Sequence, residues 1–211
     1  MRRLILTLAA LLTPLPLAAR DVAGRFDYYV LALSWQPSWC SATGDARDAP
    51  ECRPGTGRDV SVHGLWPQHE RGWPQDCRSG ERDPSRRETA AMTDIMGSSG
   101  LAWHQWKKHG RCSGLSAGDY FDATRRAAAA VTVPPVLDDL ARDVNAPPAV
   151  IEEAFLEANP ALSADGVTIA CRDGALTEIR ICLTRDLEPR DCAPDVRRDC
   201  GAARLLIEAV R

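Results

Sequence analysis

Three features that would each point to a different class of protein are missing from this sequence. Beyond residue 19 there is no apolar run long enough to span a bilayer, and no internal repeat, low-complexity segment or linker interrupts the chain. There is also no excess of positive charge, since the formal net charge is −3 at pH 7. A protein that binds a polyanion through its overall field is normally basic. Any polyanion bound here must therefore be held by a local cluster of cations.

Motifs for several kinds of catalytic site are absent as well. The chain has no G-x-S-x-G, which disfavours a serine hydrolase of that type. None of its eight cysteines forms a C-x-x-C pair, and no two of its four histidines are four residues apart, as two zinc ligands on one helix would be. We therefore predict that the protein holds no metal and no cofactor.

The N-terminus predicts export. Residues 1–19, MRRLILTLAALLTPLPLAA, combine two arginines, a short apolar run interrupted by Pro14 and Pro16, and small residues at the end. This pattern is typical of a cleaved secretory signal peptide and is too short for a membrane-spanning helix. Residues 20–211 would then form one secreted or periplasmic domain, without membrane attachment. All eight cysteines lie in this part, and an even number in an exported chain predicts four disulfides.

The hydrophobic pattern predicts one α+β domain with antiparallel strands. Strands are expected at 26–35, around 61–63, and at 166–171, 175–182 and 203–210. Residues 69–90 are expected to form a long loop. The short strand near 61 would lead His63 into a turn at Gly64. Helices are expected at about 90–97, 101–109, 116–130, 136–144 and 150–157.

Chemically reactive side chains are concentrated in the expected helix at 101–109. Positions i, i+1, i+4 and i+5 of a helix share one face. That face would carry two imidazoles, an amide and an ammonium, from His104, Gln105, Lys108 and His109. Trp103 and Trp106 would anchor the opposite side in the core, and Gly110 would end the helix in the left-handed conformation.

This set of groups can cleave RNA without a metal, because RNA supplies its own nucleophile, the 2′-hydroxyl. Histidine titrates near neutrality and can remove one proton and deliver another, while lysine can neutralise charge on the phosphorane. The helix needs a partner histidine, and His63 is the candidate. A lone histidine is more often structural, and Trp66 beside it is equally compatible with a core position or with a stacking surface for a base.

Two segments resemble the active-site segments of the ribonuclease T2 family of secreted endoribonucleases. They are SVHGLWPQ at 61–68 and WHQWKKHGRC at 103–112, and the resemblance extends over nearly all of the chain after residue 19. It implies an α+β fold with a central antiparallel sheet flanked by helices and stapled by disulfides. The implied roles are general acid for His63, general base for His109, stabilisation of the pentacovalent intermediate for Lys108, phosphate binding for His104 and a place in the substrate site for Trp66.

The resemblance also implies the disulfides Cys40–Cys52, Cys77–Cys112, Cys171–Cys200 and Cys182–Cys192. Two positions depart from the family. Gln105 stands where a catalytic glutamate is usual, so we expect a lower pKa for the imidazole of His109 and an acid limb of the pH–rate profile at lower pH than in relatives with glutamate. Gln68 stands where some relatives have an acidic residue that contacts the base.

The predicted function is therefore endonucleolytic cleavage of single-stranded RNA through a 2′,3′-cyclic phosphate to 3′-phosphate ends. DNA would not be cleaved, and the enzyme is expected to be a monomer. The alternative is a catalytically impaired protein that binds RNA or a partner on the same fold, because Gln105 replaces the glutamate.

Overall fold

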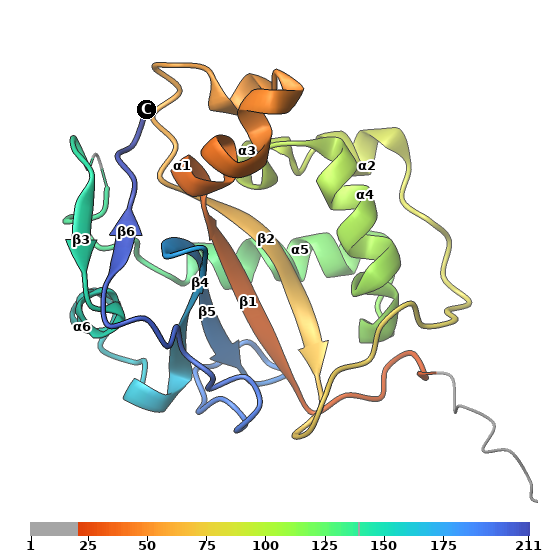
Figure 1. The fold of residues 1–211 in the computed structure, drawn as a ribbon. Coiled ribbons are helices and arrows are strands. Elements are labelled where there is room, and N and C mark those ends of the chain that lie inside the picture. The colour runs from red at the N-terminus through yellow and green to blue at the C-terminus, as the bar shows by residue number, and fades with distance from the viewer. Residues whose placement is uncertain (1–20, 139) are drawn as a thin grey trace, which may run out of the picture.

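The computed structural model describes residues 21–138 and 140–211, so the predicted signal peptide lies outside the described residues. The fold is α+β, as predicted, with a central sheet flanked by helices (Figure 1). Within the described residues the sheet has six strands in the order β2-β1-β5-β6-β3, with β4 paired to β5. The strands are β1 (Tyr28–Trp35), β2 (Val60–Gln68), β3 (Val144–Ala146), β4 (Val167–Arg172), β5 (Ala175–Leu183) and β6 (Leu205–Ile207). All pairings are antiparallel except the single-residue contact of β5 with β6.

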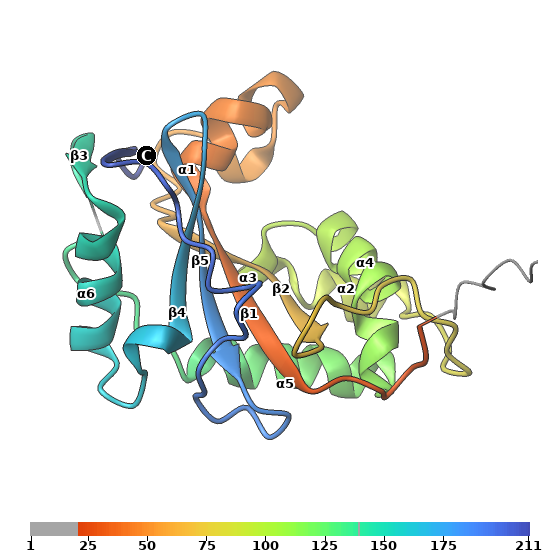
Figure 2. The same ribbon diagram turned by 60° about the horizontal axis from the view of Figure 1, so that its bottom comes forward.

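The helices are distributed around this sheet. In Figure 1, α4 lies beyond the β2 edge, α6 lies near β3 and β6, and α5 crosses behind β1 and β2; Figure 2 shows the same arrangement from below. The longer helices are α4 (Ser99–Lys108), α5 (Ala117–Ala129) and α6 (Pro148–Ala158); the shorter ones are α1 (Gln36–Trp39), α2 (Arg86–Ala90) and α3 (Thr93–Met96).

Strand β1 separates the main core from the site. Alternate residues of a strand point to opposite faces of its sheet. One face of β1 contributes Tyr29, Leu31, Leu33 and Trp35 to the main core, where they meet Trp106, Tyr120 and Phe155. The other face carries Tyr28 and Val30, which belong to a smaller cluster with Cys182 and Cys192. Because the helices fill the first face, the second is where a site can open.

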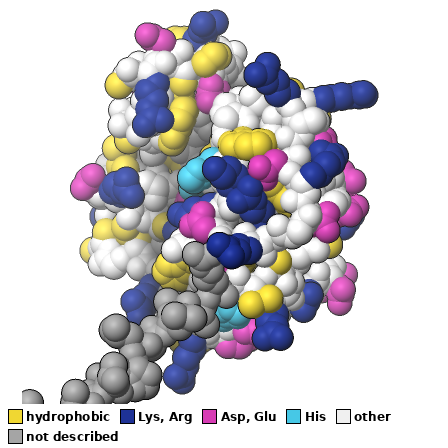
Figure 3. Space-filling model, turned by 90° about the vertical axis from the view of Figure 1, so that its right-hand side faces the viewer, with side chains coloured by type: hydrophobic (Ala, Val, Ile, Leu, Met, Phe, Trp, Pro, Cys, Tyr) yellow, Lys and Arg dark blue, Asp and Glu magenta, His cyan; other side chains and the backbone are white. Residues whose placement is uncertain are grey.

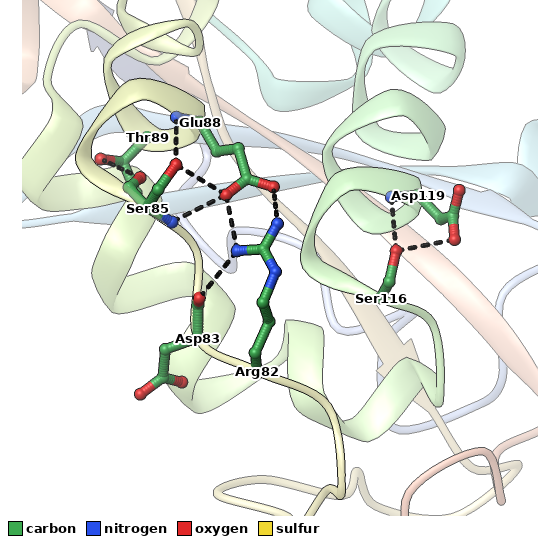
Figure 4. A network of polar contacts seen from close by, with 7 residues as sticks. All are labelled: Arg82, Asp83, Ser85, Glu88, Thr89, Ser116 and Asp119. Atoms are coloured by element: carbon green, nitrogen blue, oxygen red, sulfur yellow. Dashed lines mark hydrogen bonds and ion pairs between the residues drawn. The ribbon is translucent and has the colours of Figure 1, made fainter.

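Capping side chains start the helices near α4 (Figure 4). Before α2, Ser85 and Glu88 form a reciprocal capping box, and Arg82 holds the Glu88 carboxylate at 2.7 Å. Before α5, the Ser116 hydroxyl accepts a hydrogen bond from the Asp119 amide and donates one to its carboxylate. These bonds satisfy amide groups that a helix leaves unpaired at its first turn.

The four disulfides are those that the resemblance implied, and no cysteine among the described residues is free. Cys77–Cys112 joins the loop after β2 to the turn after α4. Cys182–Cys192 and Cys171–Cys200 attach the C-terminal segment to β5 and β4.

Removing Cys77–Cys112 with a double serine substitution should lower the free energy of unfolding by about 3–4 kcal/mol, because a cross-link over a loop of this length restricts the unfolded chain. The bond closes 35 residues of sequence, against 10 for Cys182–Cys192. Urea unfolding of both double-serine variants checks the order. An equal loss in the two variants would contradict the loop-length argument.

Several predicted elements differ from the structure. The helix expected at 136–144 is wrong: residues 135–138 form a turn, and Val144 pairs with Ile207 in β3 and β6. Pairing with the distant β6 is available to a β-branched residue and outweighs weak local helix propensity. The helix expected at 90–97 is the shorter α3, and α2 lies at the end of the stretch 69–90 that was expected to be a loop. The strand expected at 203–210 is limited to β6.

Two details of the 103–112 stretch also differ. Trp106 is fully buried as predicted, but Trp103 is 38% exposed and does not anchor the helix. Gly110 does not adopt a left-handed conformation; it begins a 3-10 turn, and the left-handed residue that ends it is Gly114, with φ 76°. Gly110 is instead confined by packing, because a Cβ there would lie 2.6 Å from the Trp106 ring.

Candidate active site

His63 lies at an irregularity of strand β2. Ala32 of β1 pairs with Gly64 and Leu33 pairs with Val62, so His63 is an extra residue without a partner in the register. Such a β-bulge redirects a side chain and is common beside active sites. The predicted turn at Gly64 is therefore wrong, because β2 continues through it to Gln68. The β-bulge, and not a turn, orients the side chain of His63.

Helix α4 supplies the second group of site residues. Ser98 caps it by accepting a hydrogen bond from Leu101, and Trp106 fixes it in the core. Gln105 and His109 are four positions apart and both are buried, with 1% and 6% of their surfaces exposed. His104 and Lys108 are one position earlier in each turn and line the same cavity. The four side chains thus share one face of α4, as predicted. Gln105 and His109 are the buried pair, and His104 and Lys108 lie nearer the solvent.

Trp66 joins the two groups. Its indole ring stacks on His109, with ring centres 5.2 Å apart and an angle of 27°, and it meets the edge of His63 at 5.1 Å. Its Nε1 donates a hydrogen bond of 2.7 Å to Oε1 of Gln105. Because indole is only a donor, this bond identifies the oxygen end of the Gln105 amide. Trp66 therefore contacts both histidines with one aromatic ring.

A glycine is required beneath this contact. A Cβ on Gly64 would lie 2.4 Å from Gln105 Oε1 and 2.5 Å from Trp66 Nε1, the two atoms of the bond just described. We expect Gly64→Ala to separate them, lowering the free energy of unfolding by about 1–3 kcal/mol and impairing any activity of the site. Thermal unfolding checks the first effect. The matched control is Gly80→Ala, whose Cβ would meet nothing within 4 Å; equal losses in both variants would contradict the steric argument.

The environment of His109 favours its neutral form. Burial lowers the pKa of His109 to about 3, and the positive charges of Lys108, His63 and His104 act in the same direction. Its Nδ1 is buried without a hydrogen-bond partner among the described residues. A neutral imidazole in a cavity is ready to accept a proton.

Two residues of the site that the sequence analysis missed come from strand β5. Glu178 is 8% exposed, and its Oε1 lies 2.5 Å from Nδ1 of His63. Its other oxygen accepts two hydrogen bonds from Arg180, at 2.9 and 2.7 Å. The sequence did hold a signal for this pair: Glu178 and Arg180 carry opposite charges at positions i and i+2 of the expected strand 175–182, and such residues lie on the same face of a strand.

The site residues surround one cavity of about 270 Å³. All seven predicted catalytic and substrate-binding residues line it: His63, Trp66, Gln68, His104, Gln105, Lys108 and His109. Arg180, Asp195 and the 55% exposed Trp73 also line it. Figure 3 views the molecule from the α4 side, where a histidine lies next to Lys and Arg side chains at a hollow in the surface.

Within residues 21–138 and 140–211, no three His, Cys, Asp or Glu side chains gather into a group that could hold a metal ion. The prediction that no metal takes part remains a prediction, and EDTA tests it below. No helix in the described part of the chain is both long and apolar enough to cross a membrane.

Comparison with known proteins identifies the family. The model of the ribonuclease T2 family matches residues 26–192. The chain belongs to this family. A ribonuclease of Aeromonas hydrophila is 39% identical over 123 residues, which cover 57% of this chain and 54% of that protein. Ribonuclease I of Escherichia coli is 31% identical over 137 residues, covering 46% and 51%. The chain thus spans about half the length of these curated relatives.

Solved structures give the same fold. The crystal structure of RNase NT in complex with 5′-AMP is similar with a TM-score of 0.63 and 25% identity, covering 86% of this ribonuclease T2 family member and 97% of RNase NT. An RNase-related protein from Calystegia sepium has a TM-score of 0.70 at 17% identity, covering 88% and 98%. The fold similarity therefore extends over nearly the full length of both solved chains.

Proposed function

We propose that this protein is an endoribonuclease that cleaves single-stranded RNA through a 2′,3′-cyclic phosphate. One observation carries the proposal: two histidines from separate elements, His63 and His109, both contact Trp66 and line one cavity together with Lys108 and His104. A base, an acid and a cation around one cavity are the groups that transphosphorylation requires. Family membership and the ribonucleases among its relatives support the same activity.

In the first step, neutral His109 accepts the proton of the 2′-hydroxyl. The 2′-oxygen forms a bond to phosphorus, and Lys108 and His104 stabilise the added negative charge of the pentacovalent intermediate. The P–O5′ bond then breaks, and the proton of His63 passes to the leaving 5′-oxygen. In the second, slower step, water opens the cyclic phosphate to a 3′-phosphate with the two histidines in exchanged roles.

The cavities beside His63 suit a chain with a nucleoside on each side of the phosphate. His63 lines the cavity with Trp66 and also a second cavity lined by Gln36, Trp39 and Leu101, among others. The exposed Trp73 offers an aromatic surface on which an unpaired base can stack, whereas His109 stacks on the Trp66 ring and Arg180 lies over it. Gln68 is buried and lines the same cavity; its Nε2 donates a hydrogen bond to the Pro67 carbonyl, which leaves its Oε1 for a base edge. The proposed substrate is therefore single-stranded RNA; DNA lacks the nucleophile. We further infer that the protein is exported and acts as a monomer.

Incubation of the purified protein with RNA, with and without EDTA, tests the proposal. We expect cleavage in both conditions and cyclic phosphate termini, which ³¹P NMR identifies. EDTA-sensitive cleavage would indicate a metal hydrolase. No cleavage in either condition would favour the impaired, binding-only protein in which Gln105 has replaced a required carboxylate.

A further inference from the structure

The contact between His63 and Glu178 spans three strands. Adjacent strands lie about 4.8 Å apart, and β1 lies between β2 and β5. On the site face of β1, Ala32 pairs with Gly64 of β2 and with Arg180 of β5. Ser34, the next β1 residue on that face, pairs with Glu178 of β5. Because Ala32 and Ser34 are both small, the two longer side chains can meet above β1. The bulge at His63 directs its ring toward this meeting point.

We propose that Glu178 is a positioning residue for His63, an inference that rests on the proposed ribonuclease function. Its carboxylate accepts the hydrogen of Nδ1, so that the proton to be donated is carried by Nε2. The tautomer of an imidazole is set by the hydrogen bond that its other nitrogen makes. After His63 has released its proton to the 5′-oxygen, the ring keeps its Nδ1 hydrogen and its orientation.

Arg180 completes the arrangement by holding the carboxylate ionised. Burial acts to raise the pKa of Glu178, but the hydrogen bonds and charges of His63 and Arg180 outweigh it, and the pKa lies below its usual value. Arg180 binds Oε2, which leaves Oε1 to His63. The other charged or titratable groups around His63 line its two cavities: His104, Lys108, His109 and Asp195 in one, and Arg47 and Glu51 in the other.

The experiment compares two substrates that differ in their need for a proton donor. A ribodinucleoside monophosphate has a strongly basic 5′-oxygen leaving group, whereas the 3′-(4-nitrophenyl phosphate) of the same nucleoside releases a weakly basic phenolate. Glu178→Gln should lower kcat on the dinucleotide about 10- to 100-fold, the size of loss found when a carboxylate that orients a metal-binding histidine is removed. It should leave kcat on the nitrophenyl ester nearly unchanged, because that leaving group departs without general acid catalysis.

A matched control breaks a carboxylate–guanidinium pair elsewhere. Asp94→Asn weakens the two-point pair of Asp94 with Arg125, neither of which lines a cavity with His63, and should change neither rate. Equal losses on the two substrates in Glu178→Gln would overturn the positioning role. If the unaltered protein cleaves neither substrate, the proposed function itself fails, and the two failures are thereby distinguished.

A spectroscopic measurement needs no activity. In ¹⁵N–¹H NMR of the unaltered protein, His63 should show a hydrogen-bonded Nδ1–H, and Glu178→Gln should remove or strongly shift that signal. Glu178→Asp, with a shorter carboxylate, should restore part of the rate on the dinucleotide. An Nδ1 that carries no hydrogen in the unaltered protein at neutral pH would overturn the proposal.

Discussion

Replacing His109 with alanine should lower kcat/KM for RNA about 10²- to 10⁴-fold, the contribution of one general base. The imidazole is buried against Trp66 and neutral in the folded protein, so it can take the 2′-hydroxyl proton. Initial rates on a dinucleotide measure the loss. The matched control is His69→Ala, which removes a histidine that does not line the cavity. Retention of most of the activity in His109→Ala would contradict the assignment of the base.

The same histidine should make the folded protein sensitive to acid. The pKa of His109 falls from 6.5 to about 3 because burial excludes the charged form. Below about pH 6.5 this histidine is protonated in the unfolded chain but stays neutral in the folded protein. The free energy of unfolding therefore decreases as the pH falls toward 3, by up to about 1.4 kcal/mol for each pH unit. His109→Ala should flatten this part of the stability curve, which urea unfolding at several pH values measures.

The part of the site that could be predicted is local in sequence. The face of α4 follows from helical spacing alone, because residues four apart share a face whatever the rest of the fold does. The burial of Trp106 followed from the same helical pattern. Trp103 shows the limit of this reasoning: the pattern assigned both tryptophans to the core, but Trp106, which meets Tyr120, is the one that is buried there.

The part that could not be predicted depends on contacts between distant segments. Glu178 is 115 residues from His63 in sequence, and only the strand order β2-β1-β5 brings them together. The bulge at His63 is a property of the pairing with β1, which no local pattern encodes. The wrong helix at 136–144 has the same origin, because Val144 pairs with Ile207 near the end of the chain.

Replacing Gln105 with glutamate should move the acid limb of the pH–rate profile upward by about 1–3 pH units, the usual effect of a new negative charge beside a histidine. Gln105 lies one helical turn before His109, and both side chains contact Trp66. A carboxylate would still accept the indole hydrogen bond, so the geometry is kept while the charge changes. A nearby carboxylate favours the imidazolium and raises the pKa of His109; the base is then protonated over a wider range, and the rate at acidic pH falls.

The control for charge is Gln105→Leu, which removes the hydrogen bond to Trp66 without adding charge. It should lower the rate at all pH values while leaving the acid limb in place, because loss of the bond disturbs the ring that supports His109. Profiles of kcat/KM from about pH 3 to 8 for the three proteins separate the two effects, because they span the range over which a buried histidine titrates. If Gln105→Glu leaves the acid limb where it is in the unaltered protein, the electrostatic role is contradicted, since burial and the neighbouring positive charges would then set the pKa of His109 whatever the charge at position 105. A shifted limb would mean that an uncharged side chain at position 105 helps to keep His109 neutral in acid. The replacement of glutamate by glutamine would then extend the activity to lower pH and would not inactivate the site.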